Sequence, residues 1–224
     1  METQRYTATA QTQSTLATNK VLRNTYMLLA MTLLFSAATA GLAMAMQVGQ
    51  MVGLGALLLS FGILMFGIPK YAESTTGLWL TFVFTGLMGF SIGPILNAYI
   101  AAFSNGGQIV MLALGGTGTI FLGLSAYALT TKKDFNFLQG FLMVGILLAV
   151  LGSFAMLIFP IPLFSLALSG VFVLLMSGLI LFETSRIIHG GETNYILATV
   201  NLFVALYNLF LSLLHILGAF AGEK

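Results

Sequence analysis

The sequence predicts an all-α membrane protein with seven transmembrane helices. Of its 224 residues, 58% are hydrophobic and only 6% are charged, whereas a soluble domain carries about 25% charged residues. A chain with so few charges cannot cover a soluble surface, so most of its surface must face lipid. Apolar stretches near the roughly 20 residues that a helix needs to cross the hydrocarbon recur along the chain, while barrel strands would be shorter and alternating.

The residues ahead of the first apolar stretch, 1–23, are rich in Thr, Gln and Ser. Such a composition cannot bury a core and predicts a flexible tail before a transmembrane domain at 24–222. Ala43 and Ala45 resemble the small-residue site of a cleaved signal peptide, but the long polar lead-in and the long apolar run favour an uncleaved first helix. The seven predicted helices cover residues 25–47, 51–69, 78–102, 109–130, 138–159, 163–182 and 195–220.

The basic residues predict the orientation of the helices. Only Lys224 falls on one face of a seven-span topology, and every other Lys and Arg falls on the opposite face: Arg5, Lys20, Arg23, Lys70, Lys132, Lys133 and Arg186. The positive-inside rule makes the basic face cytoplasmic. We therefore expect a cytoplasmic N-terminus and a C-terminus on the other side of the membrane.

The charge and the cysteine count exclude several classes of site. A net charge of +2 is too small to predict a nucleic acid partner. The absence of cysteine rules out disulfides, thiolate metal sites and cysteine nucleophiles. His189 and His215 have no carboxylate at ligand spacing, and residues 115–118 (GGTG) lack the lysine of a phosphate-binding loop. No metal and no other cofactor are expected.

Small residues are frequent in the third and fourth predicted helices. They recur at spacings of three or four residues: Gly86, Gly89 and Gly93, then Gly115, Thr119 and Gly123. Such spacing lets helix backbones approach closely, so tight packing is the first interpretation. Pro94 removes a backbone hydrogen bond and predicts a kink in the third helix, which leaves a kinked, moving helix as the alternative.

A polar stripe follows the last predicted helix. At about 100° per residue, its positions share an arc of roughly 80°: Asn201, Ala205, Asn208, Ser212 and His215. Polar side chains in a span should face protein or water. We therefore expect other helices to surround this one, with Leu202 and Leu209 more accessible to lipid. The asparagines either bond to neighbouring helices or line a polar cavity or ion path.

Glu183 directly follows the sixth predicted helix. It is either an interfacial charge paired with Arg186 at i+3, or a partly desolvated carboxylate that faces the polar stripe and responds to pH. The candidate residues of a polar core or pH sensor are Glu183, Arg186, Asn97, Asn201, Asn208, Ser212 and His215.

A serine motif at residues 89–93 (GFSIG) has the G-x-S-x-G form of a hydrolase nucleophile. That motif needs a strand–turn–helix setting, whereas here it lies inside a predicted helix. Membrane-interior proteases use a serine and a histidine, so Ser91 with His215 remains a remote alternative. The expected topology puts Ser91 near the middle of its helix and His215 near the non-cytoplasmic end of the last one.

Several stretches resemble the Bax inhibitor-1/YccA family of membrane proteins, in particular its bacterial YccA branch. They are residues 20–26 (KVLRNTY), 93–97 (GPILN), 182–195 (FETSRIIHGGETNY) and 206–210 (LYNLF). The resemblance spans nearly the whole chain. It implies a bundle of six helices around a central seventh, which agrees with the polar stripe, and a place in the bacterial inner membrane.

The resemblance also implies two functions. Some relatives are pH-sensitive calcium leak channels whose sensor is a pair of carboxylates; Glu183 matches the first position, but Ala205 occupies the second. A two-carboxylate sensor therefore cannot form, and calcium transit becomes the alternative. The YccA branch restrains the membrane-anchored ATP-dependent protease FtsH. We therefore expect a regulator rather than an enzyme, which binds FtsH, slows it and is itself a slow substrate.

Overall fold

Nine helical segments in the residues that the structure describes build seven spans. The computed structural model describes the backbone of residues 2–222 and the side chains of residues 16–156 and 158–222. The segments are α1 (Glu2–Ala45), α2 (Gln50–Gly62), a π-helix η1 (Ile63–Gly67), α3 (Ile68–Tyr71), α4 (Thr75–Ala102), α5 (Gly106–Thr131), α6 (Leu138–Ile158), α7 (Pro162–Ile188) and α8 (Tyr195–Ala221). No strand occurs within residues 2–222, so the predicted all-α class is confirmed.

Seven helices are long and apolar enough to cross a membrane, as the sequence predicts. Among the C-terminal ends of the spans, the largest shift concerns the sixth, which the sequence ends at residue 182 and the structure ends at Ile188. The prediction stopped where the first charge interrupts the apolar run. The helix continues because Glu183 and Arg186 bond to each other and the carboxylate also bonds to α8.

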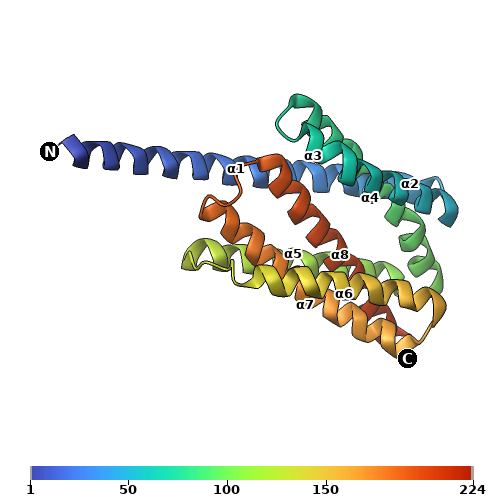
Figure 1. Ribbon diagram of the computed structural model, residues 1–224. Coiled ribbons are helices and arrows are strands. Elements are labelled where there is room, and N and C mark those ends of the chain that lie inside the picture. Colours follow the sequence, from blue (N-terminus) through green and yellow to red (C-terminus); the bar gives the residue numbers. More distant parts are fainter. Residues whose placement is uncertain (1, 223–224) are drawn as a thin grey trace.

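The first helix extends well beyond the bundle (Figure 1). It runs without a break from Glu2 to Ala45, while its membrane-length part begins at Thr18. The predicted tail, residues 1–23, therefore continues the helix from residue 2 onward and projects away from the other helices. Its flexibility stays a prediction.

The second span is built from three pieces. The π turn of η1 separates α2 from the short α3, and Pro69 follows directly in the first turn of α3. Proline has no N–H and its ring disfavours an ordinary helical turn before it. A π turn at this place lets the span continue through the proline to Tyr71.

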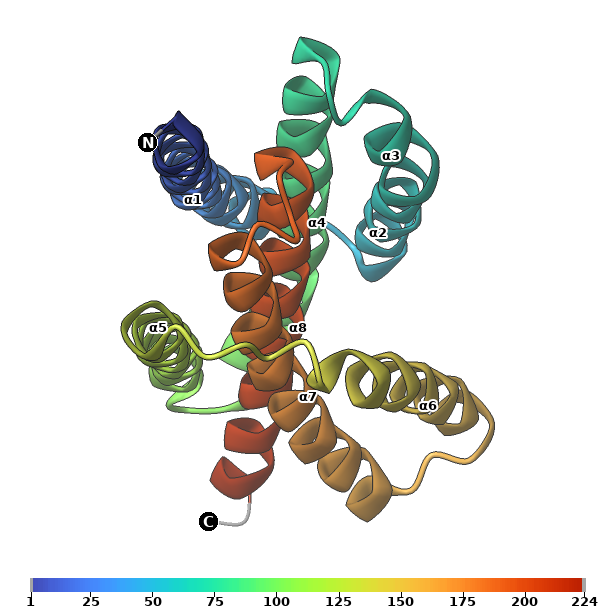
Figure 2. The same cartoon turned by 60° about the vertical axis from the view of Figure 1, so that its left-hand side comes forward.

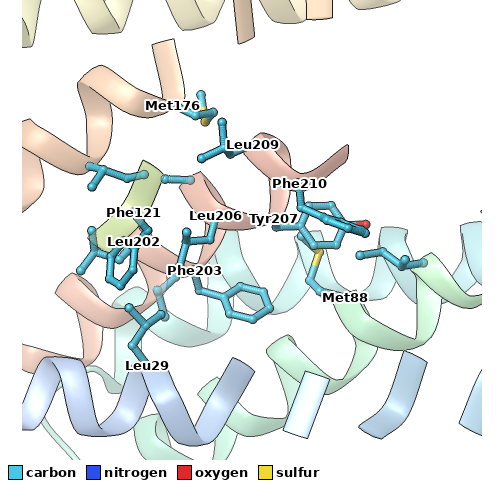
Figure 3. Packing of buried hydrophobic residues seen from close by; sticks show 14 of the residues in the cluster. Leu29, Met88, Phe121, Met176, Leu202, Phe203, Leu206, Tyr207, Leu209 and Phe210 are labelled. Carbon is cyan, nitrogen blue, oxygen red and sulfur yellow. The ribbon is translucent and has the colours of Figure 1, made fainter. Parts of the chain in front are cut away.

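The last helix, α8, runs through the interior of the bundle. It packs against α1, α4, α5 and α7, whereas α2 packs on α4 and α6 packs on α7 (Figure 2). The predicted arrangement of six helices around a central seventh is therefore not confirmed, since α2 and α6 pack on α4 and α7 and form an outer layer. Figure 3 shows why α8 is buried on several faces: Leu209 lies beside Met176 of α7, and Tyr207 lies beside Met88 of α4.

The expectation that Leu202 and Leu209 are accessible to lipid is wrong. Both side chains have 0% of their surface exposed, while Asn201, Asn208 and His215 are half-buried. The prediction assumed that one face of α8 must meet lipid, but a helix with neighbours on several faces can bury its apolar side chains all round.

The glycines of α4 bring it against α1. A side chain at Gly86 would collide with Phe35, one at Gly89 with the backbone of Ser36, and one at Gly93 with Ala43. This confirms the close packing predicted for these three positions. Polar bonds join the same two helices, because Thr39 Oγ1 donates to the carbonyl oxygen of Gly86 at 2.9 Å.

The small residues of α5 behave differently. A side chain added at Gly115 or Gly123 would meet no atom within 4 Å, and Thr119 is exposed and bonds to the carbonyl of Gly115 in its own helix. The prediction of close packing is wrong for these positions, because spacing alone does not say which face of a helix meets a neighbour.

Candidate functional site

A buried carboxylate joins α7 to α8. Only 3% of the surface of Glu183 is exposed. Arg186 Nη1 donates to its two carboxylate oxygens at 3.3 and 3.4 Å, and Asn201 Nδ2 donates to Oε1 at 3.2 Å. Glu183 thus makes the contacts of both interpretations, because it pairs with Arg186 at i+3 and also faces the first residue of the polar stripe. A response of this carboxylate to pH stays a prediction.

The network continues into the loop between α7 and α8. Arg186 Nη2 lies 3.4 Å from Glu192 Oε2, and Glu192 Oε1 accepts from the backbone N–H of Asn194 at 2.9 Å. The Asn194 side chain caps α8 by accepting from the N–H of Ile196 at 2.9 Å, and donates to the carbonyl oxygen of Ala72 at 2.9 Å. One polar chain therefore connects α7, α8 and the end of the second span.

Sequence reasoning missed Asn194 and Glu192 as parts of this site. Asn194 stood directly before the last apolar segment, where asparagine is a preferred helix cap, so the signal was present. Nothing in the sequence indicated its second bond to Ala72, because the two residues are 122 positions apart.

The connections that follow three of the spans meet at this end of the bundle, where Lys70 and Arg186 lie in the last turns of α3 and α7 and Lys132 follows α5. Besides the link to Ala72, His189 Nε2 lies 3.1 Å from the carbonyl oxygen of Lys132, and the N–H of Phe135 donates to Ser185 Oγ at 3.0 Å. The loops that follow the second, fourth and sixth spans thus gather at one end, as the topology predicts. Which side of the membrane this end faces stays a prediction, and Lys224 lies outside the described residues.

The polar stripe of α8 does not form one cluster. Asn208 Nδ2 donates at 2.9 Å to the carbonyl of Val204 in its own helix, and His215 Nδ1 pairs at 2.7 Å with Ser169 Oγ of α7. Ala205 and Ser212 are buried. The contacts of Asn201 and His215 match the interpretation that the polar side chains bond to neighbouring helices. An ion path along the stripe stays a prediction.

Asn97 and Pro94 serve contacts of α4 with other helices. Asn97 Nδ2 donates to the carbonyl oxygen of Met44 in α1 at 3.1 Å. Helix α4 continues through Pro94, and the proline ring lies against α2, where a Cβ at Gly53 would come within 3.0 Å of its Cγ. The kink at Pro94 stays a prediction.

Ser91 and His215 take part in separate hydrogen bonds. Ser91 Oγ lies 2.7 Å from the carbonyl of Met88 and 3.0 Å from the hydroxyl of Tyr207, while His215 pairs with Ser169. A serine protease needs its nucleophile in contact with its base, so this geometry lends no support to the protease alternative. Among the described residues, no three His, Cys, Asp or Glu side chains could hold a metal ion together.

Comparisons with known proteins match almost the entire chain. The model of a family described as "Inhibitor of apoptosis-promoting Bax1" covers residues 18–222. A protein of Escherichia coli K12 named "Modulator of FtsH protease YccA" is 52% identical over 92% of both chains, as is one of E. coli O6:H1 named "Inner membrane protein YccA". An uncharacterized membrane protein of Vibrio cholerae is 49% identical over 97% of both chains.

Proposed function

Because this chain belongs to the Bax inhibitor-1 family and is 52% identical to a protein named as a modulator of FtsH protease, we propose that it binds and restrains an FtsH-type membrane protease. That identity, which extends over 92% of both chains, is the observation that carries the proposal. The proposed location is the bacterial inner membrane, with the N-terminus in the cytoplasm.

The shape of α1 suggests how the restraint works. An ATP-dependent protease first engages a terminal segment, and termini are where proteolysis concentrates. The N-terminal part of α1 projects beyond the bundle (Figure 1), and the same helix continues as the first span. A pull on this segment therefore acts directly on the contact between α1 and α4.

The contact between α1 and α4 resists such a pull. Glycines bring the two backbones together, and bonds from Thr39 to Gly86 and from Asn97 to Met44 cross the interface. The protease would hold the tail while the bundle comes apart only slowly. During that time it is occupied and its other membrane substrates persist longer.

The candidate residues support a regulator rather than an enzyme. Glu183, Arg186 and Asn201 bond to one another, and His215 bonds to Ser169. Each of these bonds joins two helices or braces the end of one. They hold neighbouring helices together, which supports the proposal that the bundle resists extraction.

Removal of residues 2–15 tests the proposal, because it shortens the projecting segment and keeps Lys20 and Arg23 for insertion. The full chain should co-purify with the protease from mild detergent and slow the decay of another membrane substrate. The truncated chain should insert normally, bind the protease less and turn over more slowly. Unchanged turnover of the truncated chain, or a full chain that neither binds the protease nor alters decay of its substrates, would refute it.

A pH-sensitive calcium leak is the second candidate function. One observation favours it: Glu183, which matches the first position of the sensor in the resemblance, is buried between α7 and α8. Against it, the second sensor position is Ala205, and the partner of Glu183 on α8 is an amide. This candidate therefore ranks below the protease regulator.

A further inference from the structure

An apolar groove of about 470 Å³ lies between α1, α4, α5 and α8. Leu33 and Met44 mark its extent on α1, Val110 and Phe121 mark it on α5, and Leu206 is one of the α8 residues that line its floor. All of its lining residues are uncharged. It is separate from the Glu183 network, which shares no residue with it.

The groove is closed at one end and bounded by separated helices along its length. Tyr26 of α1 stacks on Phe121 of α5 with ring centroids 5.8 Å apart, which closes the end nearer to the Glu183 network. Beyond this stack, α1 and α5 flank α8 without packing against each other (Figure 2). The lining residues of α1 and α4 fall in the second half of their spans, those of α5 reach from its first half to Phe121, and those of α8 lie around its middle. The groove therefore extends from the middle of the bundle toward the end away from Glu183.

Two glycines keep the groove open. A side chain added at Gly41 of α1 or at Gly118 of α5 would meet no atom of the protein within 4 Å, and both residues line the groove. On α4, by contrast, glycines make close contacts with other parts of the protein. Here they leave space that the protein itself does not fill.

The apolar lining and the volume of the groove indicate what kind of molecule fills it. Water is not favoured in an apolar cavity, and an unfilled one loses dispersion contacts along its walls. A volume of 470 Å³ falls in the roughly 300–1,000 Å³ range of small-ligand sites, and the apolar molecules that surround a membrane span are lipid chains.

We propose that this groove binds one acyl chain of a membrane phospholipid, which completes the packing between α1 and α5. Because no lining residue is charged, the site recognises the chain and is indifferent to the headgroup. In the proposed orientation of the protein, the lipid belongs to the leaflet away from the cytoplasm.

Photocrosslinking tests the proposal on the full chain in phosphatidylcholine vesicles that contain a small fraction of phosphatidylcholine with a diazirine within one acyl chain. After irradiation, mass spectrometry should find cross-links concentrated at residues 33–44 and 110–121, above the level on the exposed face of α6. Replacing the headgroup of the probe by phosphatidylglycerol should leave this pattern unchanged. Labelling of the groove no higher than that of α6 would overturn the proposal.

Matched glycine variants assign the cross-links to the groove. Gly118→Leu should fill the space and abolish groove labelling, while Gly123→Leu, on the same helix and with equally open surroundings, should retain it. Gly41→Leu repeats the test from the opposite wall if Gly118→Leu does not fold. Full labelling in both filled variants would refute the site. If the protein is dimeric and the groove is not labelled, a second copy of the chain fills the groove, and this result would also overturn the proposal.

Thermal stability gives an independent measurement. Added phospholipid should raise the Tm of the detergent-purified protein and of Gly123→Leu, because a ligand of the folded state stabilises it. It should raise the Tm of Gly118→Leu less, since leucine replaces part of the lipid. An equal rise in all three proteins would contradict the proposal.

Discussion

Glu183 lies within α7 although a carboxylate is unfavourable inside a membrane-spanning helix. Its acceptor oxygens are used by Arg186 and Asn201, and Arg186 in turn reaches Glu192. The charge is therefore tolerated because α7, α8 and their connecting loop supply donors together. The same contacts hold the two helices in register at this end of the bundle.

The first prediction concerns this ion pair. Arg186→Gln should lower the Tm of the purified protein, since a hydrogen bond to a charged group contributes about 1.5–3 kcal/mol and the carboxylate loses that partner. In a Glu183→Gln background the same change should have a smaller effect, because no buried charge is left behind. Differential scanning fluorimetry in detergent measures both.

Lys133→Gln is the matched control for Arg186→Gln in both backgrounds, because it removes an exposed charge at the same end of the bundle. An exposed substitution away from bonded groups usually changes stability by less than about 0.5 kcal/mol. Equal losses for Arg186→Gln in both backgrounds would show that the arginine acts without Glu183.

The second prediction concerns ion leak. Ala205 lies one helical turn after Asn201, which contacts Glu183, so residues 201 and 205 share a face of α8. The unmodified protein should show little pH-gated calcium flux in liposomes. Ala205→Asp should increase the pH dependence, because two nearby carboxylates share a proton.

Ala205→Asn is the control, since the asparagine side chain has nearly the same shape as that of aspartate but carries no charge. A strong pH-gated leak in the unmodified protein that Glu183→Gln abolishes would place the calcium channel above the protease regulator.

At the scale of elements, α1 and α4 form the interface on which the proposed function depends. Gly89 has no room for a side chain, because a Cβ would collide with the backbone and hydroxyl of Ser36. The close approach also brings Thr39 Oγ1 within 2.9 Å of the carbonyl of Gly86. Helix α8 then braces both helices from the interior.

The third prediction is that Gly89→Leu separates α1 from α4. The Tm should fall, and the protease should degrade the variant faster than the unmodified chain, because less work is needed to extract α1. Thermal unfolding in detergent measures the Tm. A pulse-chase experiment in cells with and without the protease measures how much of the turnover is due to the protease.

Gly55→Leu is the control for this variant, since it adds the same side chain on α2 where no atom lies within 4 Å. If Gly89→Leu lowers the Tm but leaves turnover unchanged, resistance of the α1–α4 contact does not set the rate of degradation.

At the scale of the whole molecule, loops that are far apart in sequence gather at one end. Asn194 reaches Ala72 and His189 reaches Lys132, so the connections after the second, fourth and sixth spans lie together. This gathering fits an odd number of spans with the two termini on opposite sides of the membrane.

The fourth prediction concerns this orientation. A reporter enzyme that is active only outside the cytoplasm should be active when fused after Lys224 and silent when fused after Lys133, because the positive-inside rule keeps the basic end in the cytoplasm. Enzyme activity in whole cells, normalised to the amount of fusion protein, measures both. The opposite result would reverse the orientation and remove the cytoplasmic tail from the proposed function.

The amino-acid sequence was enough to predict the class of the protein and the number of its spans, because low charge and apolar runs of membrane length leave only a helical bundle. It also located Glu183 and the polar face of α8, since helical periodicity is local. The sequence did not predict that Asn201 reaches Glu183, that His215 pairs with Ser169, or that Leu202 and Leu209 are buried. Those contacts depend on which helices are neighbours, and neighbours are chosen by packing between segments far apart in the chain.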